Sequence, residues 1–413
     1  MSRYGCLGER LPHSFSKEIH EKIGAYPYEL LEVAPGDLDA FLIRRDFTGI
    51  NVTIPYKEKV IPYLSEISDR ARRIGAVNTV VNRDGKLYGD NTDYAGLRAL
   101  AQKTGIDFSG KKVLVLGTGG TSKTALAVAR DGGAADVFRV SRTRRENAVS
   151  YEEAYRAHAD AQIIINTTPC GMFPELFASP VELNRFPRLC GVLDAVYNPL
   201  RTELVLQALS MGIPAAGGLY MLVAQATAAA EIFTASSLPD DLTDRIFREL
   251  TREKENIVLI GMPSCGKTSV GKRFAQRKNL RWMDTDDEIY RRTGRSPAQI
   301  IETFGEERFR QIETETLRQL AAQGGAVIST GGGTVLRNEN VQALRHNGRI
   351  FWLNRRYELL TPTPDRPLSD SPEKLRRLAE VRRPFYEAAA DEIIDANGSV
   401  EACADEIEAR LTL

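Results

Sequence analysis

Two glycine-rich segments of this chain each follow a run of apolar, strand-like residues and have the composition of a phosphate-binding loop. In the second segment, four residues separate Gly261 from Gly266-Lys267-Thr268, and a helical stretch through Ala275 follows. In such a loop the backbone N–H groups surround phosphates, the lysine neutralises them and the hydroxyl reaches Mg²⁺. The pattern predicts ATP or GTP binding by Gly261, Ser264, Cys265, Gly266, Lys267, Thr268 and Ser269.

The first segment, Gly117 to Ser122, also lies at a strand-to-helix junction and approximates a dinucleotide-binding fingerprint, with Ser122 in place of the third Gly or Ala. The next expected strand, 137–140, has no Asp or Glu at its tip to hold a ribose 2′-hydroxyl, whereas arginines there could hold a 2′-phosphate. NADP is therefore favoured over NAD, although a solvated basic turn would also explain the arginines. The expected contacts are Gly117, Gly119, Gly120, Thr121, Ser141, Arg142 and Thr143, with Arg144 and Arg145 as substitutes.

Polar side chains gather at the ends of the expected strands before the first loop. They occupy the segments 13–16, 51–57, 76–79 and 89–93, which hold hydroxyls, amides, a lysine and an aspartate. Such groups suit a small polyhydroxylated carboxylate. Taken singly, each has a structural explanation: Ser14 as a helix N-cap, Asn78 in a turn and Lys57 as a solvated charge.

Together with the segments 166–172 (NTTPCGM), 194–199 (DAVYNP) and 218–225 (GLYMLVAQ), these clusters resemble shikimate dehydrogenase over residues 1 to 250. The resemblance implies that Lys57 and Asp93 form the catalytic pair beside the substrate ketone. It further implies a set of substrate contacts, namely Ser14, Ser16, Asn51, Thr53, Asn78, Asp93, Tyr197 and Gln225. The chemistry agrees, because hydride delivery to a carbonyl leaves an alkoxide that must gain a proton, and a lysine paired with an aspartate can supply one.

A second set of charged and glycine residues follows the second loop. Asp284 and Asp286 lie at a strand end and point to the same side, so that one can serve Mg²⁺ and the other a substrate hydroxyl. Further segments downstream are Phe309-Arg310, Gly331-Gly332-Gly333, 365–368 (DRPL) and 382–386 (RRPFY). With these segments, residues 256 to 413 resemble shikimate kinase, which has a small nucleoside-monophosphate-kinase-like fold.

The kinase resemblance implies a role for each of these residues. Asp286 would orient the attacking hydroxyl, while Thr268 and Asp284 would serve Mg²⁺. Lys267 and Arg366 would neutralise the transferring phosphoryl group. The shikimate contacts would be Asp286, Arg310, Gly331, Gly332, Gly333 and Arg382. Phosphoryl transfer needs mainly positioning and charge stabilisation, which these residue types supply; a surface pairing of Arg310 with Glu313, one helical turn on, is the structural alternative.

The elements that must position these residues alternate between strand and helix, which predicts an α/β protein with parallel sheets. We expect a two-part dehydrogenase at 1–252, with a substrate α/β subdomain (1–100 and 217–252) and a Rossmann NADP subdomain (101–216). A P-loop nucleoside-monophosphate-kinase-like α/β domain is expected at 253–413. The helix expected at 242–254, with Leu242, Ile246, Phe247 and Leu250 on one face, would be the last of the first enzyme.

The composition is that of an ordinary globular protein of about two to three domains, with 413 residues, 42% apolar and 27% charged. The formal net charge of zero argues against nucleic-acid and membrane partners. Five scattered cysteines without a CxxC fit reduced thiols in a cytoplasmic protein, and neither a signal peptide nor a spanning segment is expected. The four histidines lack metal-ligand spacing, so no structural metal is expected. The oligomeric state is left open.

The combined expectation is an enzyme with two active sites, which reduces 3-dehydroshikimate with NADPH and then phosphorylates shikimate with ATP and Mg²⁺. These small-molecule reactions are consecutive steps of aromatic amino-acid biosynthesis. Two alternatives stay open: a first half that prefers quinate oxidation with NAD, and a dehydrogenase carrying a nucleotide-sensing, non-catalytic kinase module. The second alternative is suggested by the short stretch between Leu353 and Arg366, which contains Thr361-Pro362-Thr363-Pro364.

Overall fold

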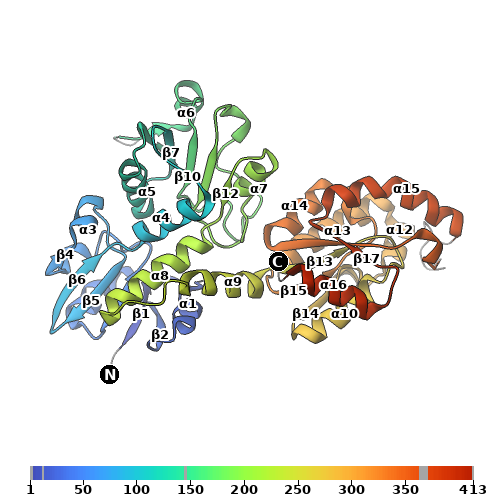
Figure 1. Cartoon of the computed structure of the whole chain (residues 1–413), viewed down its shortest axis with the longest axis horizontal. Coiled ribbons are helices and arrows are strands. Elements are labelled where there is room, and N and C mark those ends of the chain that lie inside the picture. Colours follow the sequence, from blue (N-terminus) through green and yellow to red (C-terminus); the bar gives the residue numbers. More distant parts are fainter. Residues whose placement is uncertain (1–2, 12–13, 144–146, 362–370, 412–413) are drawn as a thin grey trace. The chain divides into compact units, whose positions relative to one another are not determined.

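The computed structural model describes residues 3–11, 14–143, 147–361 and 371–411 of the chain, which divides into two compact units, Met1–Leu250 and Thr251–Leu413. Both units alternate strands with helices around their sheets, so the expected α/β class is confirmed (Figure 1). Of the residues and segments given above, position 13, Arg144, Arg145 and positions 362–368, which include Arg366, lie outside the described residues.

The first unit contains two six-stranded sheets. The order in the first sheet is β2-β1-β3-β5-β6-β4. Its strands are β1 (Tyr4–Gly8), β2 (Tyr28–Glu32), β3 (Gly49–Val52), β4 (Glu66–Ile67), β5 (Thr79–Arg83) and β6 (Lys86–Asp90). Helices α1 (Ser16–Ile23), α2 (Leu38–Arg44) and α3 (Asp69–Ile74) accompany this sheet.

The expectation of parallel strands is wrong for part of this sheet, because β5 runs antiparallel to both β3 and β6. The reversal is a tight hairpin whose two central residues, Asp84 and Gly85, have φ of 52° and 79°. An Asp-Gly pair adopts this left-handed conformation readily, and its twist matches that of the flanking strands. The hairpin places Asn78 and Asp93, at its two outer ends, on the same side of the sheet.

The second sheet of the first unit is parallel throughout, in the order β12-β11-β10-β7-β8-β9. Its strands are β7 (Lys112–Leu116), β8 (Asp136–Ser141), β9 (Val149–Ser150), β10 (Ile163–Asn166), β11 (Gly191–Asp194) and β12 (Ala215–Ala216), with helices α5 (Gly120–Asp131), α6 (Tyr151–Ala157) and α7 (Glu203–Ser210). The central strands are continuous buried apolar runs, as parallel strands covered on both faces require. Their carboxyl ends therefore meet at one edge.

Helices α4 (Asp93–Thr104) and α8 (Leu219–Thr234) lie between the two sheets (Figure 1). Leu97 and Leu100 of α4 pack with the second sheet, whereas Ala229 and Phe233 of α8 pack with the first. The two helices also approach each other closely at Gly96, where a Cβ would stand 2.5 Å from the carbonyl oxygen of Met221. This packing joins the two halves of the unit.

We expect Gly96→Ala to destabilise the first unit by about 1–3 kcal/mol, because the added methyl group must push α4 away from the α8 backbone. Thermal unfolding of the full chain measures the effect. Gly36→Ala is the matched control, since a Cβ at Gly36 meets nothing within 4 Å. Equal unfolding temperatures for the two variants would contradict the prediction.

The second unit is built on one parallel sheet in the order β14-β15-β13-β16-β17. Its strands are β13 (Asn256–Ile260), β14 (Arg281–Asp284), β15 (Ala326–Ser329), β16 (Gly348–Asn354) and β17 (Glu392–Asp395). The helices are α10 (Lys267–Lys278), α11 (Thr285–Thr293), α12 (Pro297–Phe304), α13 (Glu306–Ala321), α14 (Asn338–Asn347), α15 (Pro372–Ala389) and α16 (Val400–Leu411). The core joins β13, β15 and β16 to α10, α13 and α16.

Helix α9 (Leu242–Lys254) has the bounds expected from the sequence, and the division between the units falls within it. Leu242, Ile246 and Leu250 are buried against α1 and α8. None of the helices in the described part of the chain combines the length and apolar character needed to cross a bilayer.

Candidate functional sites

A cavity of about 650 Å³ in the first unit is lined by strands of the first sheet and by loops that follow the strands of the second. Of the residues predicted to bind substrate or to act in catalysis, the lining includes Ser14, Ser16, Asn51, Thr53, Lys57, Asp93, Tyr197 and Gln225. Thr121, from the predicted cofactor loop, lines the same cavity. The structure thus brings together side chains that lie far apart in the sequence.

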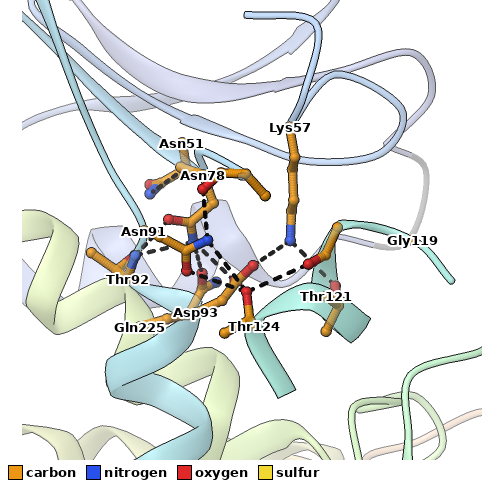
Figure 2. A network of polar contacts seen from close by, with 12 residues as sticks. Asn51, Lys57, Asn78, Asn91, Thr92, Asp93, Gly119, Thr121, Thr124 and Gln225 are labelled. Carbon is orange, nitrogen blue, oxygen red and sulfur yellow. Dashed lines mark hydrogen bonds and ion pairs between the residues drawn. The ribbon is translucent and has the colours of Figure 1, made fainter. Parts of the chain in front are cut away.

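The closest polar contact in this cavity joins Lys57 to Asp93. The Lys57 Nζ lies 2.5 Å from Asp93 Oδ2, and the two side chains are only 13% and 6% exposed. Asp93 begins α4, where the helix dipole favours a negative charge. Thr121 Oγ1 lies 3.5 Å from Lys57 Nζ, so the ammonium group faces the start of α5 as well (Figure 2). The pair places a buried, orientated proton donor at the meeting point of the two halves.

Asn78 holds this pair in place through both ends of its amide. Its Nδ2 lies 2.9 Å from Asp93 Oδ1 and 2.8 Å from Gln225 Oε1, while its Oδ1 accepts from the backbone N–H of Thr92 at 2.7 Å. Asn78 is nearly fully buried. Figure 2 shows Asn78 beside Lys57, with Asp93 and Gln225 lower in the view. Asp93 therefore has both oxygens engaged, which fixes its carboxylate relative to the lysine.

Asn51 is held by hydrogen bonds to two other buried side chains, Tyr28 and Thr79. Its Oδ1 accepts from the Tyr28 hydroxyl at 2.7 Å, and its Nδ2 lies 3.3 Å from Thr79 Oγ1. Tyr28 is itself buried and stacks on His20. Only 6% of Asn51 is exposed.

Ser14, Ser16 and Tyr197 line another part of the cavity. The backbone N–H of Ser16 donates to Ser14 Oγ at 3.3 Å, and the Phe15 ring packs against the Tyr197 ring. Burial, followed by the effect of Cys6, raises the pKa of Tyr197 to about 12, so its hydroxyl stays a hydrogen-bond donor at neutral pH.

Sequence reasoning missed several residues of this cavity, including Cys6, Glu9, Arg10, Thr167, Thr168 and Met172. Thr167 and Thr168 could have been predicted to line the site. They follow β10, whose carboxyl end lies at the same sheet edge as the carboxyl ends of β7 and β11.

The predicted cofactor loop lies where β7 ends and α5 begins. Gly117 has φ of 110°, and a Cβ there would stand 2.8 Å from Thr167 Oγ1, so only glycine fits. Gly119 precedes α5, and a Cβ at Gly120 would stand 3.2 Å from Lys57 Cδ. The N–H groups at this helix start can form an anion site beside Lys57.

The residues predicted to recognise the 2′-phosphate lie at the end of β8, next to the end of β7. Ser141 is buried, and its Oγ accepts from the backbone N–H of Thr143 at 3.3 Å. Arg142 is exposed at the tip of the strand. The turn thus presents a hydroxyl and a guanidinium group at the edge where the cofactor loop lies.

In the second unit, the phosphate-binding loop joins β13 to α10. Gly261 and Gly266 have φ of 144° and 104°. Lys267 is buried and its Nζ lies within 2.9 Å of the carbonyl oxygens of Gly261 and Met262. Cys265 is also buried, whereas Ser264 and Ser269 are exposed. The loop therefore joins a strand to a helix, as predicted, and the Lys267 ammonium group donates to carbonyl groups of the loop itself.

Thr268 and Asp284, the predicted Mg²⁺ residues, lie together, with Thr268 Oγ1 3.1 Å from Asp284 Oδ2. The other oxygen of Asp284 accepts from the backbone N–H of Asp286 at 2.9 Å, which caps α11. The carboxyl ends of β13 and β14 meet at one sheet edge, because both strands are parallel to β15. A hydroxyl and a carboxylate at this distance are suitable oxygen ligands for Mg²⁺.

The remaining predicted residues form a compact cluster beside this edge. Arg310 Nη1 lies 2.8 Å from Glu313 Oε2, and Thr334 donates to the other oxygen of Glu313 at 2.8 Å. Glu313 is only 1% exposed, so the pair is not the surface pairing that the sequence left open. Arg382 is buried nearby, next to Tyr386, which hydrogen bonds to Gly332 O at 2.5 Å.

The three glycines leave no room for side chains. A Cβ at Gly333 would stand 2.5 Å from Arg310, one at Gly331 would stand 2.8 Å from Glu313, and one at Gly332 would stand 2.8 Å from Pro263. The glycine turn therefore packs between the guanidinium group and the phosphate-binding loop. Asp286 approaches the same turn, with Oδ1 3.6 Å from the Cβ position of Gly331.

Comparison with known proteins identifies both units. The family model "Shikimate dehydrogenase substrate binding domain" matches residues 6–80, and "Shikimate kinase" matches residues 263–412. A shikimate dehydrogenase (NADP(+)) from Clostridium perfringens is 36% identical over 273 residues, covering 60% of this chain and 98% of the relative.

Solved structures agree with these matches. Shikimate dehydrogenase 1 from Peptoclostridium difficile is 38% identical, with a TM-score of 0.56 over 60% of this chain and 98% of that chain. The Thermus thermophilus shikimate 5-dehydrogenase in complex with NADP(H) and shikimate is 32% identical, with a TM-score of 0.54 over 60% and 99%. The chain therefore belongs to the shikimate dehydrogenase family, to which it adds a C-terminal shikimate kinase domain.

Proposed function

We propose that the chain is a bifunctional enzyme that reduces 3-dehydroshikimate to shikimate with NADPH and phosphorylates shikimate to shikimate 3-phosphate with ATP and Mg²⁺. The observation that carries the proposal is that the fold assembles two separate sets of reactive groups: the Lys57–Asp93 pair in the cavity of the first unit and the Lys267–Asp284–Asp286 edge of the second. The relatives named above support the first activity, and the match to the kinase family supports the second.

In the first site, NADPH would supply a hydride to the ketone carbon. Lys57, paired with Asp93, would donate a proton to the carbonyl oxygen as the alkoxide forms. Its positive charge also stabilises that oxygen while the charge develops. Asn78 and Gln225 fix the carboxylate, and the hydroxyls of Ser14, Ser16 and Tyr197 orient the substrate. The residues at the start of α5 and the end of β8 fit a dinucleotide that carries a 2′-phosphate.

In the second site, ATP with Mg²⁺ would supply the phosphoryl group. Asp286 would orient the attacking hydroxyl of shikimate and accept its proton, while Thr268 and Asp284, which lie 3.1 Å apart, would hold the metal ion. Arg310 and Arg382 bind the carboxylate of shikimate. The backbone of the phosphate-binding loop and Lys267 neutralise the transferring group. Arg366, the second cation proposed for this task, lies outside the described residues.

A single assay of the purified chain with 3-dehydroshikimate, NADPH, ATP and Mg²⁺ tests the proposal. NADPH loss is followed optically and shikimate 3-phosphate by mass spectrometry. Formation of the phosphate ester supports both activities. NADPH loss with unphosphorylated shikimate would overturn the kinase assignment, and no NADPH loss would overturn the dehydrogenase assignment.

The variant Arg142→Ala tests the proposed preference for NADPH over NADH. We expect the KM for NADPH to rise roughly tenfold or more, because a charge-assisted hydrogen bond contributes about 1.5–3 kcal/mol. The KM for NADH, which lacks the 2′-phosphate, should stay close to that of the unchanged chain. Arg130→Ala, which removes an exposed arginine of the last turn of α5, is the control. Equal losses with both cofactors would contradict recognition of the 2′-phosphate.

A further inference from the structure

Asp194, the last residue of β11, is fully buried and has no part in the two sites as described so far. Its Oδ1 accepts hydrogen bonds from Asn166 Nδ2 and from the backbone N–H of Val196, both at 2.9 Å. Its Oδ2 accepts from the Thr202 hydroxyl at 2.7 Å. One carboxylate thus accepts hydrogen bonds from three donors: Asn166 at the end of β10, Val196 just after β11, and Thr202 at the start of α7.

The first two donors begin the loops that line the dehydrogenase cavity. Asn166 ends β10 and pairs with Asp194 across the strands, and the next residues, Thr167, Thr168 and Pro169, line the cavity. Asn166 Oδ1 in turn accepts from the backbone N–H of Thr168 at 3.0 Å and from its hydroxyl at 2.7 Å. Val196 and Tyr197, which follow β11, also line the cavity. Asp194 therefore ties together the two loops that form one wall.

The same tie extends to the cofactor loop and to α7. The Thr167 hydroxyl donates to Leu116 O at 2.6 Å and abuts Gly117, where a Cβ would stand only 2.8 Å away. Thr202, the third donor, caps the start of α7 by accepting from the Val205 N–H. A shift of the Asp194 carboxylate would therefore move the substrate wall and the cofactor loop together.

The hydrogen-bond partners of Asp194 within the described residues are all neutral. They are an amide, a backbone N–H and a hydroxyl. Burial raises the pKa of Asp194 to about 7, and the hydrogen bonds from Thr202, Val196 and Asn166 act against this. The Asp194 carboxylate also acts on the nearby Cys170 thiol. Burial and then Asp194 raise the pKa of Cys170, whereas Arg142 lowers it. Because all three donors are neutral, a neutral acceptor of the same shape can satisfy them.

We propose that Asp194 is a positioning residue of the dehydrogenase site, which fixes the Thr167–Pro169 and Val196–Tyr197 loops by accepting hydrogen bonds from Asn166, Val196 and Thr202. The inference rests on the proposed dehydrogenase function. An asparagine can replace the aspartate in this role, because its oxygen keeps the bonds to Asn166 and Val196 and its Nδ2 can donate to Thr202 Oγ1. An alanine cannot.

The test compares Asp194→Ala with Asp194→Asn in the full chain. We expect Asp194→Ala to raise the KM for 3-dehydroshikimate roughly tenfold or more with a smaller change in kcat, since the displaced wall contacts substrate in both the ground state and the transition state. Asp194→Asn should stay within about threefold of the unchanged chain, the rescue expected if acceptor geometry matters. Phosphorylation of supplied shikimate, catalysed in the other unit, should be unaffected by either change.

Three outcomes would overturn the inference. Asp194→Ala with an unchanged KM would show that the wall does not depend on this carboxylate. Asp194→Asn as impaired as Asp194→Ala would show that charge is what matters. If Asp194→Ala does not fold, Asn166→Ala, which cuts the tie to the first loop alone, must raise the KM; an unchanged KM there would have the same meaning. Absence of reduction by the unchanged chain would instead overturn the proposed function, and the inference with it.

Discussion

Replacing Lys57 with alanine is expected to lower the rate of 3-dehydroshikimate reduction about 10²–10⁴-fold, the usual contribution of a positioned general acid. The loss should appear mainly in kcat, because the proton is transferred only as the alkoxide forms. Shikimate phosphorylation by the same preparation should continue. Steady-state kinetics of both reactions on one sample measures the two effects side by side.

The Lys57 variant needs two controls, because Asp93 is left buried without its cation. Asp93 keeps its hydrogen bond from Asn78, but an unpaired buried charge is destabilising. The double variant Lys57→Ala/Asp93→Asn removes that charge and should be equally inactive, with a recovered unfolding temperature. Lys59→Ala removes an exposed lysine two residues away and should retain activity. A Lys57→Ala enzyme with kcat within a factor of about three of the unchanged chain would refute the assignment.

The second large effect is expected for Asp286→Asn, which should reduce shikimate phosphorylation about 10²–10⁴-fold and leave reduction intact. The amide keeps the size of the carboxylate but cannot accept the proton of the attacking hydroxyl. The neighbouring Asp287 is exposed on the same helix turn, so Asp287→Asn is the matched control. Formation of shikimate 3-phosphate is the measured quantity.

The outcome for Asp286→Asn also separates the explanations. If nucleotide binding, measured directly, survives while phosphoryl transfer is lost, the residue acts on the acceptor, as proposed. If phosphorylation continues at the unchanged rate, Asp286 does not orient the acceptor. Loss of both reactions would instead indicate misfolding of the chain.

The features that could be predicted from the sequence are those whose signal is local. The phosphate-binding loop around Lys267 and the amphipathic helix at 242–254 depend on spacing within a few residues, and both have the expected form. The hairpin at Asp84-Gly85 is equally local, yet the alternation of strand and helix predicts parallel pairing throughout and misses it. An Asp-Gly pair between two short strands is sufficient to predict this hairpin.

The parts that could not be predicted depend on contacts between distant segments. Asn78 meets Gln225 across 147 positions, a pairing that no local pattern specifies. Burial of a charged pair could not be predicted from its spacing either. Arg310 and Glu313 have the spacing of an ordinary surface pair, and only the folded structure shows that they are buried. Asp194 belongs to a recognisable motif and two of its donors are close in sequence, but the third, Asn166, is 28 positions away and reaches it only because β10 pairs with β11.

Helix α9 bears on where the chain could be divided to express each unit alone. Leu250 is buried in the core of the first unit, and within the same helix the carbonyl oxygen of Lys254 accepts a hydrogen bond from Gly325 in the second unit. A cut between these two residues would interrupt the helix. A second unit expressed from Asn256 onward would lack the carbonyl group to which the Gly325 N–H donates.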